Sequence, residues 1–504
     1  MLRRHLGIGH LLTKVCARTE AAHGYVVANQ VLGEVDRELT LGDTGLTADC
    51  TDGQLNDFAR HFSLTLHSGI AKTSKARGID AALTWAQGKV APTGVAFPLA
   101  KPASAGADAK AGCLARLGCE KWWRGRLRKL ARRRLEHFMR RHGFVSTRAG
   151  AYVSDITLGR IRADKLRNRT TLEELRAVSD AGDELDLIDI IDGSVSNPAI
   201  RRCELMTRMR GTEELASQHG LIGCFMTLTC PSKYHAQLKR GVANPKYNHT
   251  TPREAQAYLR EVFAIIRARW ARQGIITFGF RVAEPHHDGT PHWHLMLFFS
   301  PTEVDAACAT FREIALREDG DEPGAQKHRA TIVRIDPERG SATGYLAKYI
   351  AKNIDAFGVG EDFEAALPGQ DGAERACAWG SVWGIRQFQP IGSVSVTVYR
   401  EFRRLDGRIE GADTETLERL RAACDAGDWA TFVELMGGVF VRRNEQTARL
   451  VRADSLKKSL YGEKVLRILG IALRAGGSGA HIAKTRTKVW KVERKEQVRA
   501  TGPP

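Results

Sequence analysis

A polar loop, PHHDGTP, separates two apolar segments of the 504-residue chain. This arrangement restricts the folds that the chain can adopt. The flanking segments IITFGFRVAE and HLMLFFS predict strands on either side of the loop. An earlier apolar run, LIGCFMTLTC, predicts another strand, and a helix follows it. That helix begins with a capping box, Thr251 to Glu254, and continues with apolar residues at helical spacing as far as Ile266. With a later helix, the order strand, helix, strand, strand, helix predicts an α+β domain.

Two histidines at the start of the segment after the loop have the spacing of a metal chelate. His292 and His294 are two residues apart on a predicted strand, so both side chains leave the same face. Glu284, at the end of the facing strand, is the natural third ligand. The loop offers less favoured alternatives, which are His286, His287 and Asp288. Two imidazoles and a carboxylate suit Mg²⁺ or Mn²⁺ acting on a phosphate, although the same ligands also suit zinc.

The segment GYLAKYIAKNID, interpreted as a helix, gathers two phenols and two ammonium groups in one sector. These groups belong to Tyr345, Lys348, Tyr349 and Lys352. A separate apolar stripe, Leu346, Ile350 and Ile354, is expected to dock the helix on the sheet. A tyrosine that attacks a phosphodiester must lose a proton of ordinary pKa about 10, and nearby cations or a metal ease that loss. The pattern alone is common on helix surfaces, but downstream of a histidine pair it indicates a nucleophile.

The charge balance indicates a polyanionic partner, with nucleic acid ahead of anionic lipid. Lys and Arg number 76 against 58 Asp and Glu, a net charge of +18, and residues 120–142 alone carry ten basic residues against two glutamates. We expect Arg132, Arg133 and Arg134 in this segment to contact DNA phosphates, although a solvated basic helix would have the same composition. No apolar run reaches the length of a membrane helix.

Aromatic residues near Arg386 offer a surface for stacking the bases of single-stranded DNA. They are Trp379 and Trp383, and packing in a core accounts for them equally well. The ten cysteines are scattered without CxxC spacing, and with no secretory leader seen we expect a cytoplasmic protein with reduced thiols.

Shifts in composition predict five regions along the chain. Residues 1–110 have no role that can be assigned, and they end in an exposed linker near 101–112. The remaining regions are a basic helical DNA-binding region at 113–200, the α+β domain at 201–406, a helical region at 407–475 and a flexible basic tail at 476–504. Within the second region, a basic helix is expected from Thr157 to about Val178.

In these motifs the chain resembles the bacteriophage replication gene A protein family, rolling-circle initiators of the HUH endonuclease superfamily. The resemblance spans roughly residues 118–406 and rests on six ordered motifs, among them FMTLTCPSKYH, FRVAEPHHDGTPHWHLMLF, GYLAKYIAKNID and WGIRQFQ. It implies a central antiparallel sheet with flanking helices. For the N- and C-terminal regions, which lie outside the resemblance, we expect mainly helical structure. The resemblance also implies that His292 and His294 bind the metal and that Tyr345 and Tyr349 are nucleophiles. Lys348 and Lys352 match the accompanying lysines, and Glu284 matches the acidic position ahead of the histidines.

The implied reaction is strand-specific nicking of a phage or prophage origin, single-stranded at the nick, through a 5′-phosphotyrosine that is later rejoined. The family also implies a host helicase and polymerase as partners. A rival from another class is a non-catalytic DNA-binding replication or regulatory protein with the same fold. An HUH transposase or relaxase is a second rival. A zinc hydrolase ranks below both, because HWH lacks the HExxH helix and its general base.

Overall fold

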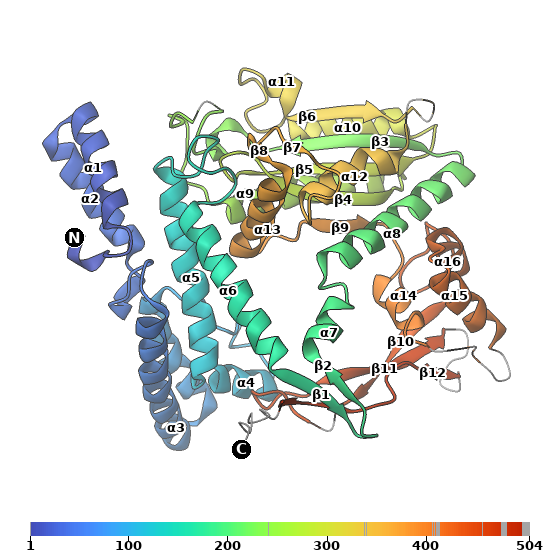
Figure 1. Cartoon of the computed structure of the whole chain (residues 1–504), viewed down its shortest axis with the longest axis horizontal. Coiled ribbons are helices and arrows are strands. Elements are labelled where there is room, and N and C mark those ends of the chain that lie inside the picture. Colours follow the sequence, from blue (N-terminus) through green and yellow to red (C-terminus); the bar gives the residue numbers. More distant parts are fainter. Residues whose placement is uncertain are drawn as a thin grey trace, which may run out of the picture. The chain divides into compact units, whose positions relative to one another are not determined.

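The computed structural model is α+β, with several antiparallel sheets and with helical segments toward both ends of the chain (Figure 1). It describes residues 2–495 except 240, 337, 339, 406, 408, 410–413, 456 and 475–480. The chain divides into two compact units, residues 1–144 with 454–467 and residues 145–453 with 468–504. No helix of the described ranges combines the length and the hydropathy of a membrane span. The predicted fold class is confirmed.

The first unit is built from helices, and these include residues in which no clear hydrophobic pattern was recognised. They are α1 (Gly9–His23), α2 (Tyr25–Leu39), α3 (Asp52–Val90), α4 (Ala107–Leu117) and α5 (Glu120–Arg141). Gly78, at φ +83°, breaks α3 into two halves, and Gly69 leaves room for the Trp85 ring, which a Cβ at that position would overlap. The exposed linker expected near 101–112 needs correction, because α4 starts at Ala107 and buries Cys113.

The second unit contains a five-stranded antiparallel sheet in the order β6-β3-β5-β4-β9. Its strands are β3 (Ile222–Thr229), β4 (Phe278–Pro285), β5 (Pro291–Phe299), β6 (Ala330–Arg334) and β9 (Phe388–Ile391). The predicted hairpin is confirmed as β4 and β5, which pair from Phe278 opposite Phe298 to Pro285 opposite Pro291. The short edge strands β6 and β9 were not predicted. Both lack the long apolar runs of the central strands, since an edge strand has a neighbour on one side only.

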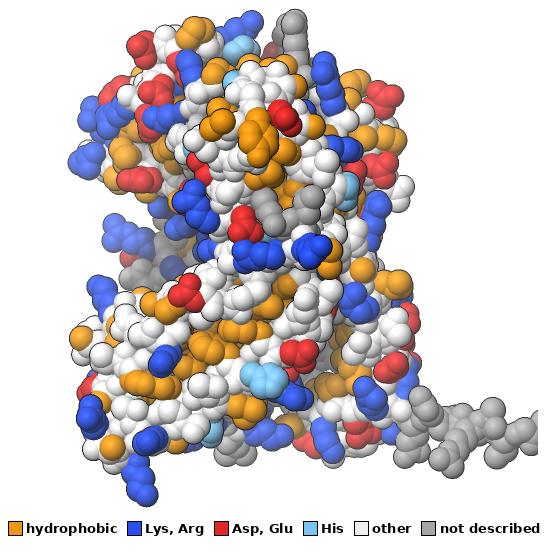
Figure 2. Space-filling view, turned by 90° about the vertical axis from the view of Figure 1, so that its left-hand side faces the viewer, with side chains coloured by type: hydrophobic (Ala, Val, Ile, Leu, Met, Phe, Trp, Pro, Cys, Tyr) orange, Lys and Arg blue, Asp and Glu red, His pale blue; other side chains and the backbone are white. Residues whose placement is uncertain are grey.

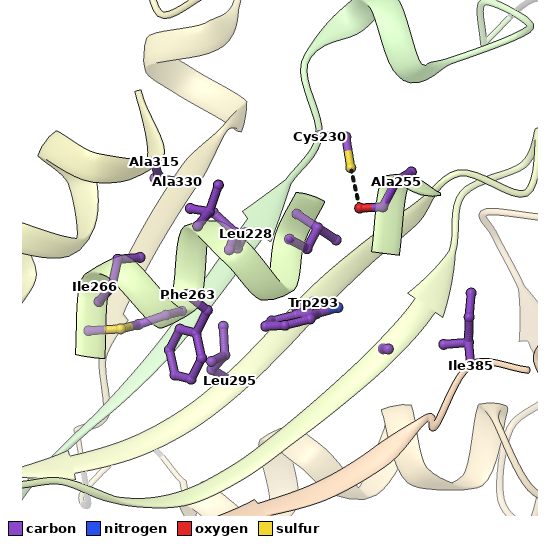
Figure 3. Packing of buried hydrophobic residues seen from close by; sticks show 14 of the residues in the cluster. Leu228, Cys230, Ala255, Phe263, Ile266, Trp293, Leu295, Ala315, Ala330 and Ile385 are labelled. Atoms are coloured by element: carbon purple, nitrogen blue, oxygen red, sulfur yellow. Dashed lines mark hydrogen bonds between the residues drawn. The ribbon is translucent and has the colours of Figure 1, made fainter. Parts of the chain in front are cut away.

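Helices cover both faces of this sheet. On one face, α9 (Pro252–Arg272) and α10 (Val304–Ala315) pack on alternate residues such as Trp293 and Leu295, as Figure 3 shows for α9. On the other face, α8 (Pro198–Gln218) and α12 (Ala342–Lys352) share a core with Phe225 and Met296. The predicted capping box of α9 is present, with Thr251 and Glu254 bonded to each other's backbone N–H groups. Side chains of β4 and β5 therefore alternate between two separate hydrophobic cores.

The unit boundaries differ from those expected from composition. Helix α5 packs with α3 in the first unit, whereas α6 (Asp155–Glu173) belongs to the second, so the predicted region 113–200 is divided between them. The helix expected from Thr157 to about Val178 also ends early, because β1 (Leu175–Ser179) takes its last residues into a sheet with β2 (Glu184–Asp186).

The C-terminal part needs a similar correction. The expected helices are present as α15 (Glu415–Asp425) and α16 (Trp429–Leu435), but strands follow them. They are β10 (Ala448–Asp454), β11 (Leu466–Leu473), β12 (Ile482–Lys484) and β13 (Trp490–Arg494). The flexible tail predicted at 476–504 is thus ordered at β12 and β13, because β12 pairs with β11 and β13 pairs with β1. Residues 476–480 and 496–504 lie outside the described part of that prediction.

Candidate active site

Three buried side chains converge on the sheet face that α12 covers. Register places Glu284 of β4 opposite His292 of β5, and His294 follows on the same face. The Nε2 atoms of the two histidines are 3.0 Å apart. Oε2 of Glu284 lies 4.0 Å from the first and 3.8 Å from the second. The structure therefore brings together the three residues that the sequence singled out as metal ligands, and their donor atoms lie within 4.8 Å of one another.

Burial sets the protonation of this triad. It lowers the pKa of His292 well below its usual value and that of His294 to about 3, so both imidazoles are neutral at physiological pH. Burial raises the pKa of Glu284 to about 7, against the opposing effects of the Lys352 charge and a hydrogen bond from Asn353. The two facing Nε2 atoms share at most one proton, which leaves a lone pair directed at the gap between them. Neutral imidazoles beside a carboxylate fit a divalent cation.

A polar network surrounds Glu284, and sequence reasoning found only one of its members. Lys352 is 8% exposed, and its Nζ lies 3.6 Å from Oε2 of Glu284 and 3.2 Å from Oδ1 of Asp362. The amide of Asn353 donates to Oε1 of Glu284, and the hydroxyl of Tyr152 donates to Asp362 at 2.7 Å. Lys352 was predicted to lie beside the phenols. Its contacts are instead with carboxylates, whose charges raise its pKa although burial works against them.

The two tyrosines of α12 differ in their distance from the triad. The Tyr349 ring is half-buried, and its centroid lies 4.1 Å from that of His294 and 5.4 Å from that of Phe225. Tyr345 is 42% exposed and lies 6.1 Å from the Phe225 ring. Burial, together with the Glu284 charge, raises the pKa of Tyr349. Tyr349 is thus the phenol that the fold places against the histidines.

Helix α12 is held in place at its N-terminus and along one side. Its Ser341 cap accepts a hydrogen bond from Gly344 N at 2.9 Å, and the Glu213 carboxylate of α8 accepts from Ala342 N at 2.6 Å and from Thr343 N at 2.9 Å. The predicted apolar stripe is buried as expected, with Leu346, Ile350 and Ile354 in the core shared with α8. Glu213 was missed by the sequence reasoning, because nothing near it in sequence connects it to α12.

The alternative ligands in the loop between β4 and β5 are engaged in other contacts. Asp288 accepts hydrogen bonds from the backbone of Ala236 and Thr290 and so shapes the loop. Nδ1 of His286 and Nδ1 of His287 lie 3.3 Å and 3.7 Å from one oxygen of Glu364. The His286 ring stacks on His292 at 4.0 Å. Glu284 is accordingly the carboxylate that completes the triad.

An open pocket lies on the other side of α12. It has a volume of about 670 Å³, and its lining includes Lys348, Phe357 and Phe363. Those two phenylalanine side chains are 68% and 79% exposed, an unusual position for large apolar rings. The ammonium group of Lys348 lies 5.7 Å from the Phe363 ring, and the guanidinium of Arg202 lies 3.9 Å from the Phe357 ring. Sequence reasoning missed both rings.

The arginines proposed to bind DNA are in mixed environments. Arg134 is half-buried, and it donates to the backbone carbonyls of Glu38 and Thr40 within the first unit. Arg132 and Arg133 are also half-buried, whereas Lys121, Arg126 and Lys129 form the exposed side of α5. On the face drawn in Figure 2, Lys and Arg side chains are spread among acidic and hydrophobic ones.

Arg386 and the tryptophans near it have separate roles. Arg386 is exposed, and its contact with DNA stays a prediction. Trp379 and Trp383 are 0% and 2% exposed and lie in the core, so packing is their role in this structure.

Comparison with known proteins connects this arrangement to a family. The model of the bacteriophage replication gene A protein family matches residues 53–357, which include the triad and both tyrosines. The chain belongs to this family. The gene A match begins within α3, so it also covers part of a region for which no family motif was seen in the sequence.

Individual relatives agree with that assignment. The chain is 43% identical to the replication gene A protein of Escherichia phage 186, over 78% of this chain and 57% of the relative. It is 40% identical to a probable replication protein, P12, of Pseudoalteromonas phage PM2, over 74% of this chain and 58% of the relative. A probable replication endonuclease from a prophage-like region of Salmonella typhimurium is 36% identical, over 71% of this chain and 46% of the relative. The chain thus spans about half the length of these relatives, and no solved structure matches it.

Proposed function

We propose that this chain is a phage or prophage DNA replication initiator that nicks one strand of an origin through a tyrosine nucleophile, as in HUH endonucleases. The observation that carries the proposal is the 4.1 Å separation between the rings of Tyr349 and His294 beside a buried set of metal-ligand residues. Family membership supports a role in phage replication, and relatives named as probable replication endonucleases support nuclease activity.

In the proposed reaction, a tyrosine oxygen attacks the phosphorus of one phosphodiester in the strand. An oxygen–phosphorus bond to the tyrosine forms, and the bond between phosphorus and the 3′ oxygen breaks. The phenol gives up its proton, and the departing 3′ oxygen takes one. The 5′ end stays joined to the protein, and the free 3′-OH primes DNA synthesis. Rejoining reverses these steps, so the energy of the broken bond is conserved and no ATP is needed.

Two tyrosines allow a second cut while the first remains esterified. Tyr345 and Tyr349 are one helical turn apart, so both lie on the side of α12 that faces Phe225. Tyr349 is the nucleophile for the first cut in this proposal, because its ring is next to His294. Tyr345, which is more exposed, would then cut the regenerated origin, and the new 3′-OH would attack the first phosphotyrosine and close a circle.

The buried triad fits a divalent ion such as Mg²⁺ or Mn²⁺. His292, His294 and Glu284 would hold it, and its positive charge would favour the ionised phenol and the charge that develops on the phosphate. Lys352 acts through Glu284 in this proposal, as a positioning residue that keeps the carboxylate ionised and correctly placed. Asn353 fixes the other carboxylate oxygen.

The pocket beside Lys348 is the proposed path of the single strand next to the nick. Exposed phenylalanine rings provide stacking surfaces for unpaired bases, and Lys348 provides positive charge for the backbone, whereas the charge of Arg202 is paired with Asp355. Host helicase and polymerase remain the partners expected from the family.

The proposal is tested by incubating the protein with supercoiled phage DNA and Mg²⁺ and searching for nicked circles that carry covalently attached protein. Mass spectrometry of the adduct should place the DNA on Tyr349 or Tyr345. Binding to origin DNA without any adduct would instead favour a non-catalytic DNA-binding protein with the same fold.

A further inference from the structure

An unusual arginine lies on the sheet face opposite the triad. Arg281 is three residues before Glu284 in β4, so its side chain leaves the other face, toward α9. It is 5% exposed, its guanidinium lies 4.3 Å from the ring of Trp293, and one of its terminal nitrogens donates to the carbonyl of Arg386 at 2.7 Å. Its buried Nε atom has no hydrogen-bond partner among the residues that the structure describes. Figure 3 shows Trp293 beside Phe263, between the strands and α9.

Within the described ranges, the charge of Arg281 also lacks a counterion. In the described chain, no carboxylate forms an ion pair with it, and burial together with the positive charges of Arg386 and Arg260 lowers its pKa to about 10. Buried charges in proteins are normally paired, since an unpaired one loses its hydration without compensation. The aromatic ring and one carbonyl replace only part of that hydration. This environment favours the binding of an anion next to Arg281.

A cavity next to Arg281 has the size and the charge for such an anion. Its volume is about 570 Å³, and it is bounded by α9, by the centre of the sheet and by the edge strand β9. The charged residues of its lining are Arg260, Arg267, Arg281 and Glu261. The net charge of this lining is therefore positive, and both arginines of α9 are exposed at its rim.

We propose that this cavity binds a phosphate-bearing ligand, with Arg281 at its base and Arg260 and Arg267 at its rim. A guanidinium presents parallel N–H groups that match two oxygens of one phosphate, and the free Nε of Arg281 is one such group. Two sources have this chemistry, a free phosphate compound such as a nucleotide and a backbone phosphate of DNA. The site is separate from the triad and does not depend on the nicking mechanism.

The test measures the binding of inorganic phosphate by calorimetry at constant ionic strength, with EDTA present to keep metal out of the triad. The full chain is compared with Arg260→Ala/Arg267→Ala, whose substitutions are at exposed positions and should leave the fold intact. A matched control, Arg253→Ala/Arg272→Ala, removes two exposed arginines of the same helix that do not line the cavity. We expect saturable binding to one site, at least tenfold weaker in the first variant and within twofold of wild type in the control.

Several results would overturn the proposal. These are the absence of saturable phosphate binding, equal weakening in both arginine variants, and loss of phosphate binding in His292→Ala/His294→Ala, which would place the anion at the triad. Arg281→Met provides a second variant, and its thermal midpoint should no longer rise with added phosphate.

The source of the phosphate is identified with a single-stranded oligonucleotide that lacks an origin. Competition between oligonucleotide and phosphate would identify a DNA phosphate as the ligand, and independent binding would identify a free phosphate compound.

Discussion

The ammonium nitrogen of Lys352 lies 3.6 Å from Oε2 of Glu284, and both side chains are almost fully buried. This contact ties the ionisation of a proposed metal ligand to a charge on the helix that carries the tyrosines.

Metal affinity should rise with pH up to about 7. Glu284 has a pKa of about 7 and binds metal only when ionised, so protons compete with metal below that pH. The two histidines have lowered pKa values, so their protonation does not compete with metal near pH 7. We expect Mn²⁺ affinity, measured by calorimetry, to fall about tenfold per pH unit below 7. Lys352→Met should move the profile to higher pH, and the exposed Lys348→Met should not. A profile that is flat between pH 5 and 7 would contradict the assignment of Glu284.

Removing the triad should abolish cleavage and spare DNA binding. We expect His292→Ala/His294→Ala to lose measurable Mn²⁺ binding and nicking, because two of three ligands are gone, and Glu284→Ala to be impaired in both. His219→Ala, a change to an exposed histidine paired with Glu434, serves as the control. Full cleavage by the double mutant with Mg²⁺ present would disprove a role for the pair.

The two tyrosines should contribute unequally to the rate of the first cleavage, and both should be required for the full cycle of cleavage and rejoining. Tyr349→Phe should slow the first cleavage of a single-stranded origin oligonucleotide more than Tyr345→Phe does, because only Tyr349 lies against His294. Each single mutant should fail to release circles from a plasmid carrying the origin, and the double mutant should form no adduct. Circle formation at wild-type yield in either single mutant would refute the paired mechanism.

The basic residues of α5 should fall into two groups, those that contact DNA and those that contact the rest of the first unit. Replacing the exposed Lys121, Arg126 and Lys129 with Gln should weaken DNA binding for all sequences and lower the slope of log affinity against log salt by about 3. Arg134→Ala should instead destabilise the first unit by about 1–3 kcal/mol, because two backbone carbonyls lose their donor. Thermal unfolding and salt titrations of both variants separate the effects. An unchanged salt slope in the triple variant would show that these three side chains are solvated and do not contact DNA.

Stacking in the pocket beside α12 can be detected with 2-aminopurine, whose fluorescence falls when it stacks. With this base at successive positions of the oligonucleotide, we expect quenching at a position next to the nick. Phe363→Leu should remove the quenching and Phe363→Tyr should keep it, because only the second retains an aromatic face. Phe440→Leu changes another exposed phenylalanine and provides the control. Quenching that persists in Phe363→Leu would place the bases elsewhere.

The sequence predicted the centre of this fold far better than its periphery. Strands β4 and β5 and the triad were predictable because the hairpin brings Glu284, His292 and His294 together through local register. Helix α12 was predictable from its apolar stripe. Glu213 and Tyr152 were not, since each reaches the site from an element distant in sequence. Asp362 was missed for another reason, because the two-residue strand β7 (Glu361–Asp362) that carries it has no recognisable pattern. The strands β10 to β13 were mistaken for helix and flexible tail, because nothing near them in sequence indicates their partners.

The pairing of β1 with β13 also has a consequence for how the chain is made. Arg176 and Glu493, which bond across this pair, are separated by 317 residues. At ordinary rates of synthesis, β1 leaves the ribosome about 15–60 s before its neighbour does. Until then one edge of its sheet lacks a partner, and the second unit completes that sheet only after residues 490–494 have been translated. Nascent chains stalled before this point should therefore be more sensitive to proteases around residues 175–186 than chains released after it.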